Sequence, residues 1–99
     1  MSLTNNQKKQ LKNIGHALKP VVTVAGNGLS EGVLKETERA ISDHELVKIK
    51  VAIEDRDVRQ QVVSELCDTL NGELVQQIGK VALIYRRSTK AELKTSNIR

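Results

Sequence analysis

The sequence has 99 residues, with 16 Lys and Arg against 12 Asp and Glu, a net charge of +4 and a pI near 9.4. A chain of this length buries only about 60–65% of its unfolded surface, which allows one modest core and excludes a second domain. That core must be aliphatic, because the sequence contains no Trp, no Phe and a single Tyr.

Neither a membrane anchor nor a secretion signal is expected. No stretch approaches the roughly 20 apolar residues of a membrane span, and the N-terminus from Met1 to Lys9 is polar where a signal peptide would be apolar. The single cysteine, Cys67, has no partner for an internal disulfide. We therefore expect a soluble, cytoplasmic protein with no membrane partner.

The charge is segregated along the chain. Residues 1–30 carry +4 with no acidic residue, residues 31–73 carry −5, and residues 74–99 carry +5. Such segregation is typical of proteins that meet a polyanion, although charge alone does not distinguish RNA from DNA.

Three helices are predicted from apolar residues recurring at spacings of three and four. The first begins after Thr4, a suitable N-cap, and must end before Pro20. The second follows Ser30 and ends near His44, and the third follows Asp55 and ends at Gly72.

Four strands are predicted between and after these helices. They cover residues 21–24, 45–54, 73–78 and 81–86, with a hairpin turn at Gly79-Lys80. Residues 45–54 alternate with a period of two, which places Lys48 and Lys50 on the same face of their strand.

The resulting order, αβαβαββ, predicts a two-layer α/β fold with a mixed four-stranded sheet, because strands joined through crossover helices pair at least partly in parallel. We expect residues 1–87 to form the single domain. Residues 88–99 are polar, lack a clear apolar stripe, and are expected to be a loose tail.

Enzymatic chemistry finds little support. His16 and His44 are separated from each other, and Cys67 lies on an apolar helix stripe, so neither a catalytic pair nor a zinc cluster is indicated. Gly26-Asn27-Gly28 lacks both the Gly-Lys-Ser/Thr ending of a P-loop and the full dinucleotide fingerprint. We expect no enzyme, no cofactor, no metal and no small-molecule substrate.

The glycine turn between the first strand and the second helix has two interpretations. It can be an ordinary structural turn, or it can let a nucleic-acid backbone approach closely, with the N–H groups that open the helix favouring phosphate. Because Tyr85 is the only aromatic side chain, recognition should depend on phosphates, sugars and RNA shape rather than on base stacking.

Four separated motifs resemble one family. They are Leu18-Lys19-Pro20-Val21-Val22, the segment Gly28 to Leu34, the segment His44 to Val51, and Ile78-Gly79-Lys80 with Ile84-Tyr85-Arg86. Together, from about Thr4 to Arg87, they resemble the CRM domain (chloroplast RNA splicing and ribosome maturation) in its stand-alone, bacterial YhbY-like form.

The resemblance implies a fold similar to the C-terminal domain of translation initiation factor three and a GxxG loop comparable to that of KH domains, which clamps a nucleic-acid backbone. Bacterial members are associated with precursors of the large ribosomal subunit, and plant relatives with intron splicing. Here the loop is Ala25-Gly26-Asn27-Gly28, with Ala25 in place of the first glycine. Alanine there would cost about 1 kcal/mol if the position needed a positive φ, and would be nearly harmless otherwise.

We therefore expect an RNA-binding protein that assembles the large (50S) subunit by binding ribosomal RNA. The alternative is a protein-interaction module that docks on a ribosomal protein or an assembly GTPase through the acidic middle segment. A monomer is favoured. The candidate RNA-binding residues are the loop (Ala25, Gly26, Asn27, Gly28) and the basic residues Lys8, Lys9, Lys12, Lys19, Lys48, Lys50, Lys80 and Arg86.

Overall fold

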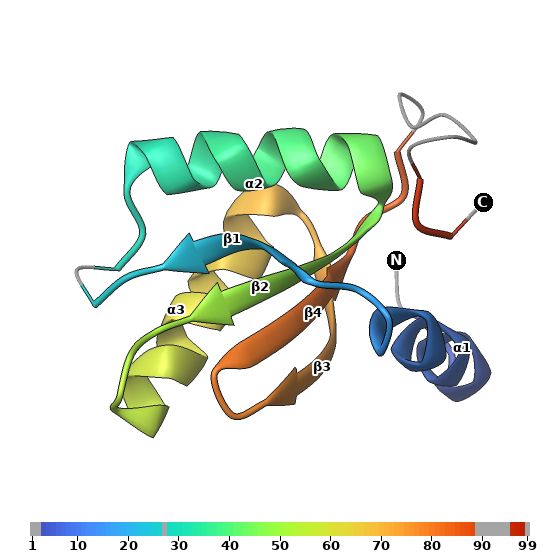
Figure 1. The fold of residues 1–99 in the computed structure, drawn as a ribbon, viewed down its shortest axis with the longest axis horizontal. Coiled ribbons are helices and arrows are strands. Elements are labelled where there is room, and N and C mark those ends of the chain that lie inside the picture. The colour runs from blue at the N-terminus through green and yellow to red at the C-terminus, as the bar shows by residue number, and fades with distance from the viewer. Residues whose placement is uncertain (1–2, 27, 89–95, 99) are drawn as a thin grey trace.

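The computed structural model describes residues 3–26, 28–88 and 96–98, and these form three helices and four strands in the predicted order (Figure 1). The elements are α1 (Asn5–Gly15), β1 (Pro20–Val24), α2 (Glu31–His44), β2 (Leu46–Val51), α3 (Arg56–Leu70), β3 (Glu73–Ile78) and β4 (Val81–Tyr85).

Each helix begins at the cap expected from the sequence. Thr4 forms a capping box with Gln7, in which each side chain accepts the other residue's backbone N–H. Ser30 caps α2, and the Asp55 carboxylate accepts two backbone N–H groups at the start of α3. These side chains satisfy donors that the first turn of a helix leaves unpaired.

The sheet is mixed and has the strand order β1-β2-β4-β3. β1 and β2 are parallel, because α2 carries the chain back between them, and β4 is antiparallel to both β2 and β3. β4 therefore lies between two strands that precede it in the sequence. The predicted mixed sheet is confirmed.

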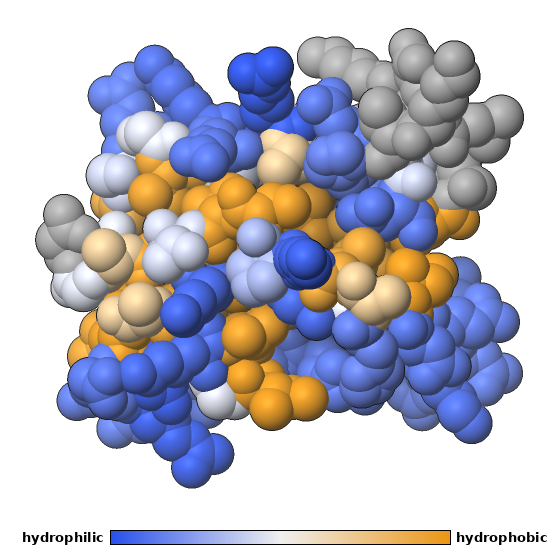
Figure 2. Space-filling model, viewed as in Figure 1, coloured by the Kyte–Doolittle hydropathy of each residue, from blue (hydrophilic) through white to orange (hydrophobic). Residues whose placement is uncertain are grey.

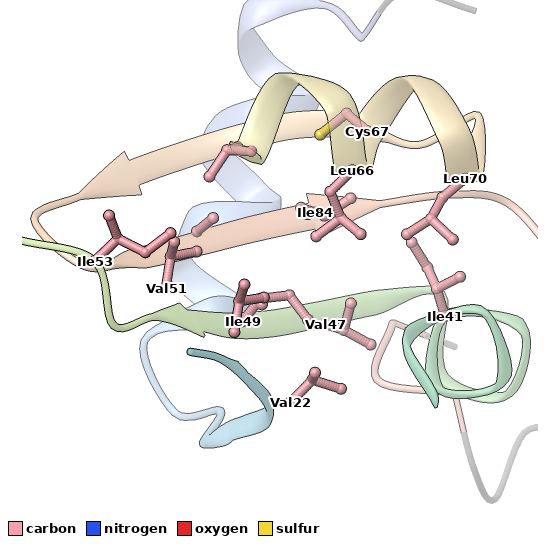
Figure 3. Packing of buried hydrophobic residues seen from close by; sticks show 13 residues of the cluster. Val22, Ile41, Val47, Ile49, Val51, Ile53, Leu66, Cys67, Leu70 and Ile84 are labelled. Carbon is pink, nitrogen blue, oxygen red and sulfur yellow. The ribbon is translucent and has the colours of Figure 1, made fainter. Parts of the chain in front are cut away.

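The main core lies between one face of the sheet and the helices α2 and α3 (Figure 3). Ile41 from α2 and Leu66 from α3 are fully buried beside Val47, Ile49 and Ile84 of the central strands. Removal of this aliphatic surface from water, at roughly 25 cal/mol per Å², stabilises the domain in place of the missing aromatics.

The opposite face of the sheet is covered only in part. Leu11 of α1 packs there with Leu46, Val75 and Leu83 in a second, smaller cluster. Gly15 allows this close approach, because a Cβ atom at this position would lie 2.5 Å from a Leu83 methyl carbon. Leu46 and Tyr85 mark one end of the sheet, so α1 covers that end and leaves the other open (Figure 1).

The end of α3 differs in detail from the prediction. Asn71, with φ of 54°, takes the left-handed position, and the N–H of Gly72 donates to the Cys67 carbonyl in a Schellman-type cap. Gly72 instead serves packing, since a Cβ atom there would lie 2.9 Å from a side-chain carbon of Ile84.

The described parts of the C-terminal segment contact the domain, in contrast to the loose tail expected for residues 88–99. Ser88 is buried and donates its N–H to the carboxylate of Glu45. Asn97 donates to the backbone carbonyls of His44 and Leu46, and Ile98 packs on the α1 cluster. Polar residues therefore anchor this segment through hydrogen bonds, a signal that an apolar stripe does not capture. Residues 89–95 and 99 lie outside the described residues.

Candidate nucleic-acid interface

The glycine loop is a tight turn whose conformation depends on its last residue. The Gly28 N–H donates to the Ala25 carbonyl at 2.9 Å, and Gly28 has φ of +84°. Ala25 is not in the left-handed region, so its methyl group causes no backbone strain. The substitution at the first position of the pattern is therefore compatible with the loop. Asn27 lies outside the described residues.

Gly26 has no structural requirement to be glycine. It is exposed, a Cβ atom there would meet nothing within 4 Å, and its φ is not positive. A glycine that the fold does not need, in an exposed turn, leaves room for another backbone to approach closely. Gly28 thus shapes the loop, whereas Gly26 is the candidate contact.

The N-terminus of α2 offers less to an anion than the sequence indicated. The Ser30 hydroxyl accepts the Val33 N–H at 3.2 Å, which occupies one of the free donors. Glu31 places a carboxylate in the first turn, where it pairs with Lys35 at 3.1 Å. A phosphate near this helix would meet a negative charge, so the turn itself is the better candidate.

Three segments meet at the same end of the sheet as the loop. Val24, the last residue of β1, is in register with Val51, the last residue of β2. The Val51 N–H donates to the carbonyl of Lys80 in the β3–β4 turn at 2.6 Å. We call this region the loop end; it comprises Ala25, Gly26, Gly28, Lys50 and Lys80, and it lies at the left in Figure 1.

Lys48 and Lys50 project from the face of the sheet that α1 covers only in part, as the alternation predicted. Lys50 is exposed and is in register with Thr23 and Val81, whereas Lys48 is partly buried and in register with Leu83. Lys50 therefore adds a positive charge beside the loop, with Lys48 one row further from it.

Lys80, at the loop end, forms an ion pair with Glu54. Its Nζ lies 2.5 Å from a carboxylate oxygen of Glu54, and this hydrogen bond and charge lower the pKa of Glu54 below its usual value of 4.5. Both side chains face solvent, so the pair is weak and can exchange with a competing phosphate.

Arg86 has a structural role. Its guanidinium donates to both carboxylate oxygens of Glu38, at 3.0 and 2.5 Å, to the Leu70 carbonyl and to the Ser42 hydroxyl. These bonds use four of its five N–H donors, and only 21% of the side chain is exposed. The sequence suggested a phosphate contact, but the tertiary structure directs this charge inward, and we do not retain it in the candidate site.

The remaining basic candidates lie away from the loop end. Lys8, Lys9 and Lys12 are on α1, which packs over the end of the sheet opposite the loop (Figure 1). Lys19 is exposed just before β1, whose first residue is in register with Lys48. The structure therefore brings Lys48 and Lys50 together with the loop and leaves the α1 lysines as a separate group.

The groups considered for catalysis have no catalytic arrangement in residues 3–26, 28–88 and 96–98. Cys67 is buried, and desolvation, with a contribution from Asp68, raises its pKa to about 11, so the thiol stays neutral at physiological pH. No group of three His, Cys, Asp or Glu side chains suited to a metal ion occurs within these ranges. Within the same ranges, no helix is long and apolar enough to cross a membrane.

The described residues form a small α/β fold with a mixed four-stranded sheet and a glycine turn beside the exposed Lys50, and the sequence is basic; this defines a class of small, basic α/β proteins. Within that class, the sequence from residue 3 to residue 86 matches the family described as the CRS1 / YhbY (CRM) domain. The chain belongs to this family, as the resemblance indicated.

Similar proteins support the assignment. The chain is 56% identical over 98 residues to the Probable RNA-binding protein PA4753 of Pseudomonas aeruginosa, covering 99% of this chain and 94% of that protein. It is 42% identical to an RNA-binding protein of Haemophilus influenzae, with 94% of each chain covered. The names of these two relatives refer to RNA binding and to no enzymatic reaction.

A solved structure has the same fold. The solution structure of the hypothetical protein SAV1595 from Staphylococcus aureus matches with a TM-score of 0.79 and 30% sequence identity, covering 89% of this chain and 92% of that one. The αβαβαββ arrangement is therefore that of a relative whose structure is known.

The sequence did not indicate two residues near the interface, Glu54 and Ile78. Glu54 contacts Lys80 across 26 residues of sequence, and Ile78 of β3 is 62% exposed on the same end of the sheet. The register of β3 shifts between Leu74 and Gln76, which interrupts the alternation of inward-facing and outward-facing residues. The sequence therefore did not indicate which side chains of β3 face outward. The predicted hairpin pairs Ile78 with Val81, and Val81 is in turn in register with Lys50. The hairpin was therefore the signal that could have placed Ile78 near Lys50.

Proposed function

We propose that this protein binds RNA through the glycine loop and the lysines of the adjacent sheet, and that its target is ribosomal RNA in precursors of the large ribosomal subunit. The observation that carries the proposal is the juxtaposition of an exposed turn, where Gly26 has no packing role, with the exposed Lys50 on the neighbouring strand. The family and the names of its relatives support RNA as the ligand.

The chemistry of the two parts is complementary. A turn without bulky side chains lets a sugar-phosphate backbone come close to the peptide backbone, as in the GxxG loop of KH domains. Lys48 and Lys50 then supply the positive charge that a phosphate chain requires. In this arrangement the loop positions the RNA backbone, and the lysines supply most of the affinity for RNA.

The test is charge reversal of both lysines, Lys48→Glu with Lys50→Glu. Loss of two phosphate contacts should reduce the slope of log affinity against log salt by about 1.4 for single-stranded RNA and weaken binding by at least roughly tenfold at physiological salt. Fluorescence anisotropy with a labelled RNA strand over a range of KCl concentrations measures both quantities.

The matched control is Lys35→Glu with Arg39→Glu on α2, which changes the net charge equally on exposed positions away from the sheet. If both double variants lose affinity equally, the effect is one of net charge and the proposed site is wrong. Circular dichroism would show whether either pair alters the fold.

The ribosomal target needs a separate measurement. Crosslinking in cells followed by RNA sequencing should recover large-subunit ribosomal RNA, and the Lys48→Glu, Lys50→Glu protein should lose this signal. Co-sedimentation with subunit precursors that persists in the double variant would instead favour docking on a protein of the particle.

A further inference from the structure

The partly covered face of the sheet exposes apolar side chains beside the candidate lysines. Two rows cross all four strands there: Thr23, Lys50, Val81 and Ile78 near the loop, and Pro20, Lys48, Leu83 and Gln76 further from it. Ile78 is 62% exposed, and Val21, on the edge strand, is 43% exposed. We call the uncovered part, consisting of Thr23, Lys48, Lys50, Ile78 and Val81, together with Val21 at the register irregularity of its β1 edge, the open face.

Ile78 and Val21 lie on opposite edge strands, with Lys50 and the half-buried Val81 on the two strands between them, so apolar and basic side chains share this face. Figure 2 shows apolar surface over the strands, interrupted by hydrophilic groups. A hollow where α1 meets the sheet extends this surface, and it is lined by Gly15, His16, Lys48, Gln76, Ile78, Val81 and Leu83. Polar side chains that can form hydrogen bonds with a ligand adjoin this surface: His16 and Gln76 line the hollow, and Thr23 lies on the open face.

The charge of the open face favours a polyanion. The two rows contain Lys48 and Lys50 and no carboxylate. In a symmetric dimer built on this face, the same lysines of two copies would be brought together in a partly desolvated interface, which like charges oppose. A ligand with phosphates and flat, apolar faces satisfies both the lysines and the aliphatic side chains.

The open face is also continuous with the loop. Thr23 lies two residues before Ala25, and its row runs across Lys50 and Val81 to Ile78, a distance of roughly 14 Å over three strand spacings. An RNA strand that runs from the loop along this row crosses Lys50 and reaches Ile78. Base-paired RNA keeps its base faces stacked inside the helix, whereas unpaired nucleotides can turn them toward the protein.

We propose that the open face binds the bases of single-stranded RNA whose backbone is held at the glycine loop, so that the ligand is an unpaired segment rather than a duplex. This inference rests on the proposed function. Ile78 and Val21 contact the bases and take the place of the aromatic stacking that the composition excludes. Lys48 and Lys50, on β2 between them, bind the phosphates.

The experiment compares one short mixed-sequence RNA strand with the same strand annealed to its complement. Ile78→Ser with Val21→Ser should weaken binding of the single strand roughly five- to tenfold through loss of apolar contact, and leave duplex binding and the salt slope unchanged. Val58→Ser is the matched control, because Val58 is a similarly exposed valine, 40% accessible, on α3.

The outcomes separate this inference from the proposed function. Unchanged affinity for the single strand, or equal losses for strand and duplex, would overturn the base-binding role while the lysine-dependent binding stands. If the unaltered protein binds neither RNA, the proposed function fails and the inference with it. Photocrosslinking of a 4-thiouridine strand to the unaltered protein gives an independent readout, with the peptides around Val21 and Ile78 expected as the products.

Discussion

The two ends of the sheet use charged residues in opposite ways. At the loop end, Lys50 is exposed and Lys80 makes one solvent-facing ion pair with Glu54. At the other end, which we call the anchor end, Arg86 is held by Glu38 and two further acceptors, and Glu45 is 1% exposed.

At the anchor end, the buried Glu45 and the partly buried Arg86 form hydrogen bonds with residues distant in the sequence, and these bonds hold the chain in place. Glu45 has φ of 65°, an uncommon conformation for a non-glycine residue, and its carboxylate accepts hydrogen bonds from the Ser88 N–H and the Ser96 hydroxyl. Its backbone carbonyl also accepts the N–H of Arg86. A residue with this many partners is positioned by the whole fold.

The difference shows that basic residues of similar appearance in the sequence serve two purposes. Buried or half-buried charges need partners, so removing one member of such a pair destabilises the protein, whereas exposed charges stay available for a polyanion. Stability and RNA affinity should consequently respond to different substitutions, and the following predictions test that separation.

The largest expected effect on stability is at the anchor end. Arg86→Ala removes four hydrogen bonds, two of them to a carboxylate, and should lower the free energy of unfolding by about 2 kcal/mol. Thermal or urea unfolding measures the loss, which corresponds to a fall in Tm of roughly 10 °C for a domain of this size.

Arg87→Ala is the control for that substitution, because the neighbouring arginine is exposed. We expect it to change stability by less than about 0.5 kcal/mol. Equal destabilisation by the two variants would contradict the structural role of Arg86.

A smaller effect is expected in the loop. Gly28→Ala places a side chain at φ of +84° and should cost about 1 kcal/mol of stability. Gly26→Ala introduces a methyl group into open space at a permitted φ and should leave stability nearly unchanged.

RNA affinity distinguishes the same two glycines. Under the proposed function, Gly26→Ala weakens binding of a labelled RNA strand without altering the unfolding curve, since the methyl group obstructs only the ligand. If Gly26→Ala binds as tightly as the unaltered protein, the loop does not make the close backbone contact.

The smallest effect should come from the exposed pair of the loop end. Since the pKa of Glu54 is lowered in the folded state, its pairing with Lys80 stabilises the protein above pH 4.5 and loses that contribution as the pH falls through the folded-state pKa. Lys80→Ala should therefore be slightly less stable than the unaltered protein at pH 7, by less than Gly28→Ala.

The difference between the Lys80→Ala and unaltered proteins should shrink as the pH falls from 4.5 through the lower folded-state pKa of Glu54, below which Glu54 is protonated in both. Urea unfolding at several pH values measures it. A difference that stays constant or grows in acid would show that Lys80 stabilises the domain by some other contact.

Much of the fold was predictable because its signals are local. The caps Thr4, Ser30 and Asp55 and the alternation from Val47 to Val51 each depend on residues a few positions apart. The loop was also locatable, as a glycine turn between a strand and a helix, and the resemblance of separate motifs gave the family.

The composition of the site was less predictable. Whether a basic residue is free depends on partners distant in the sequence: Glu38 lies 48 residues before Arg86, and Glu54 lies 26 residues before Lys80. Equally, the exposure of Ile78 follows from how little of the sheet α1 covers, and no pattern within β3 encodes that.

The sequence by itself determined the order of elements, the aliphatic core, the position of the glycine turn and the shared face of Lys48 and Lys50, since propensity, capping and periodicity act over short stretches. Contacts between distant residues place β4 between β2 and β3, turn Arg86 inward while Lys50 stays exposed, and leave an open face with apolar and basic side chains beside the loop. These features arise from pairings between distant residues, which form only when the whole chain is packed.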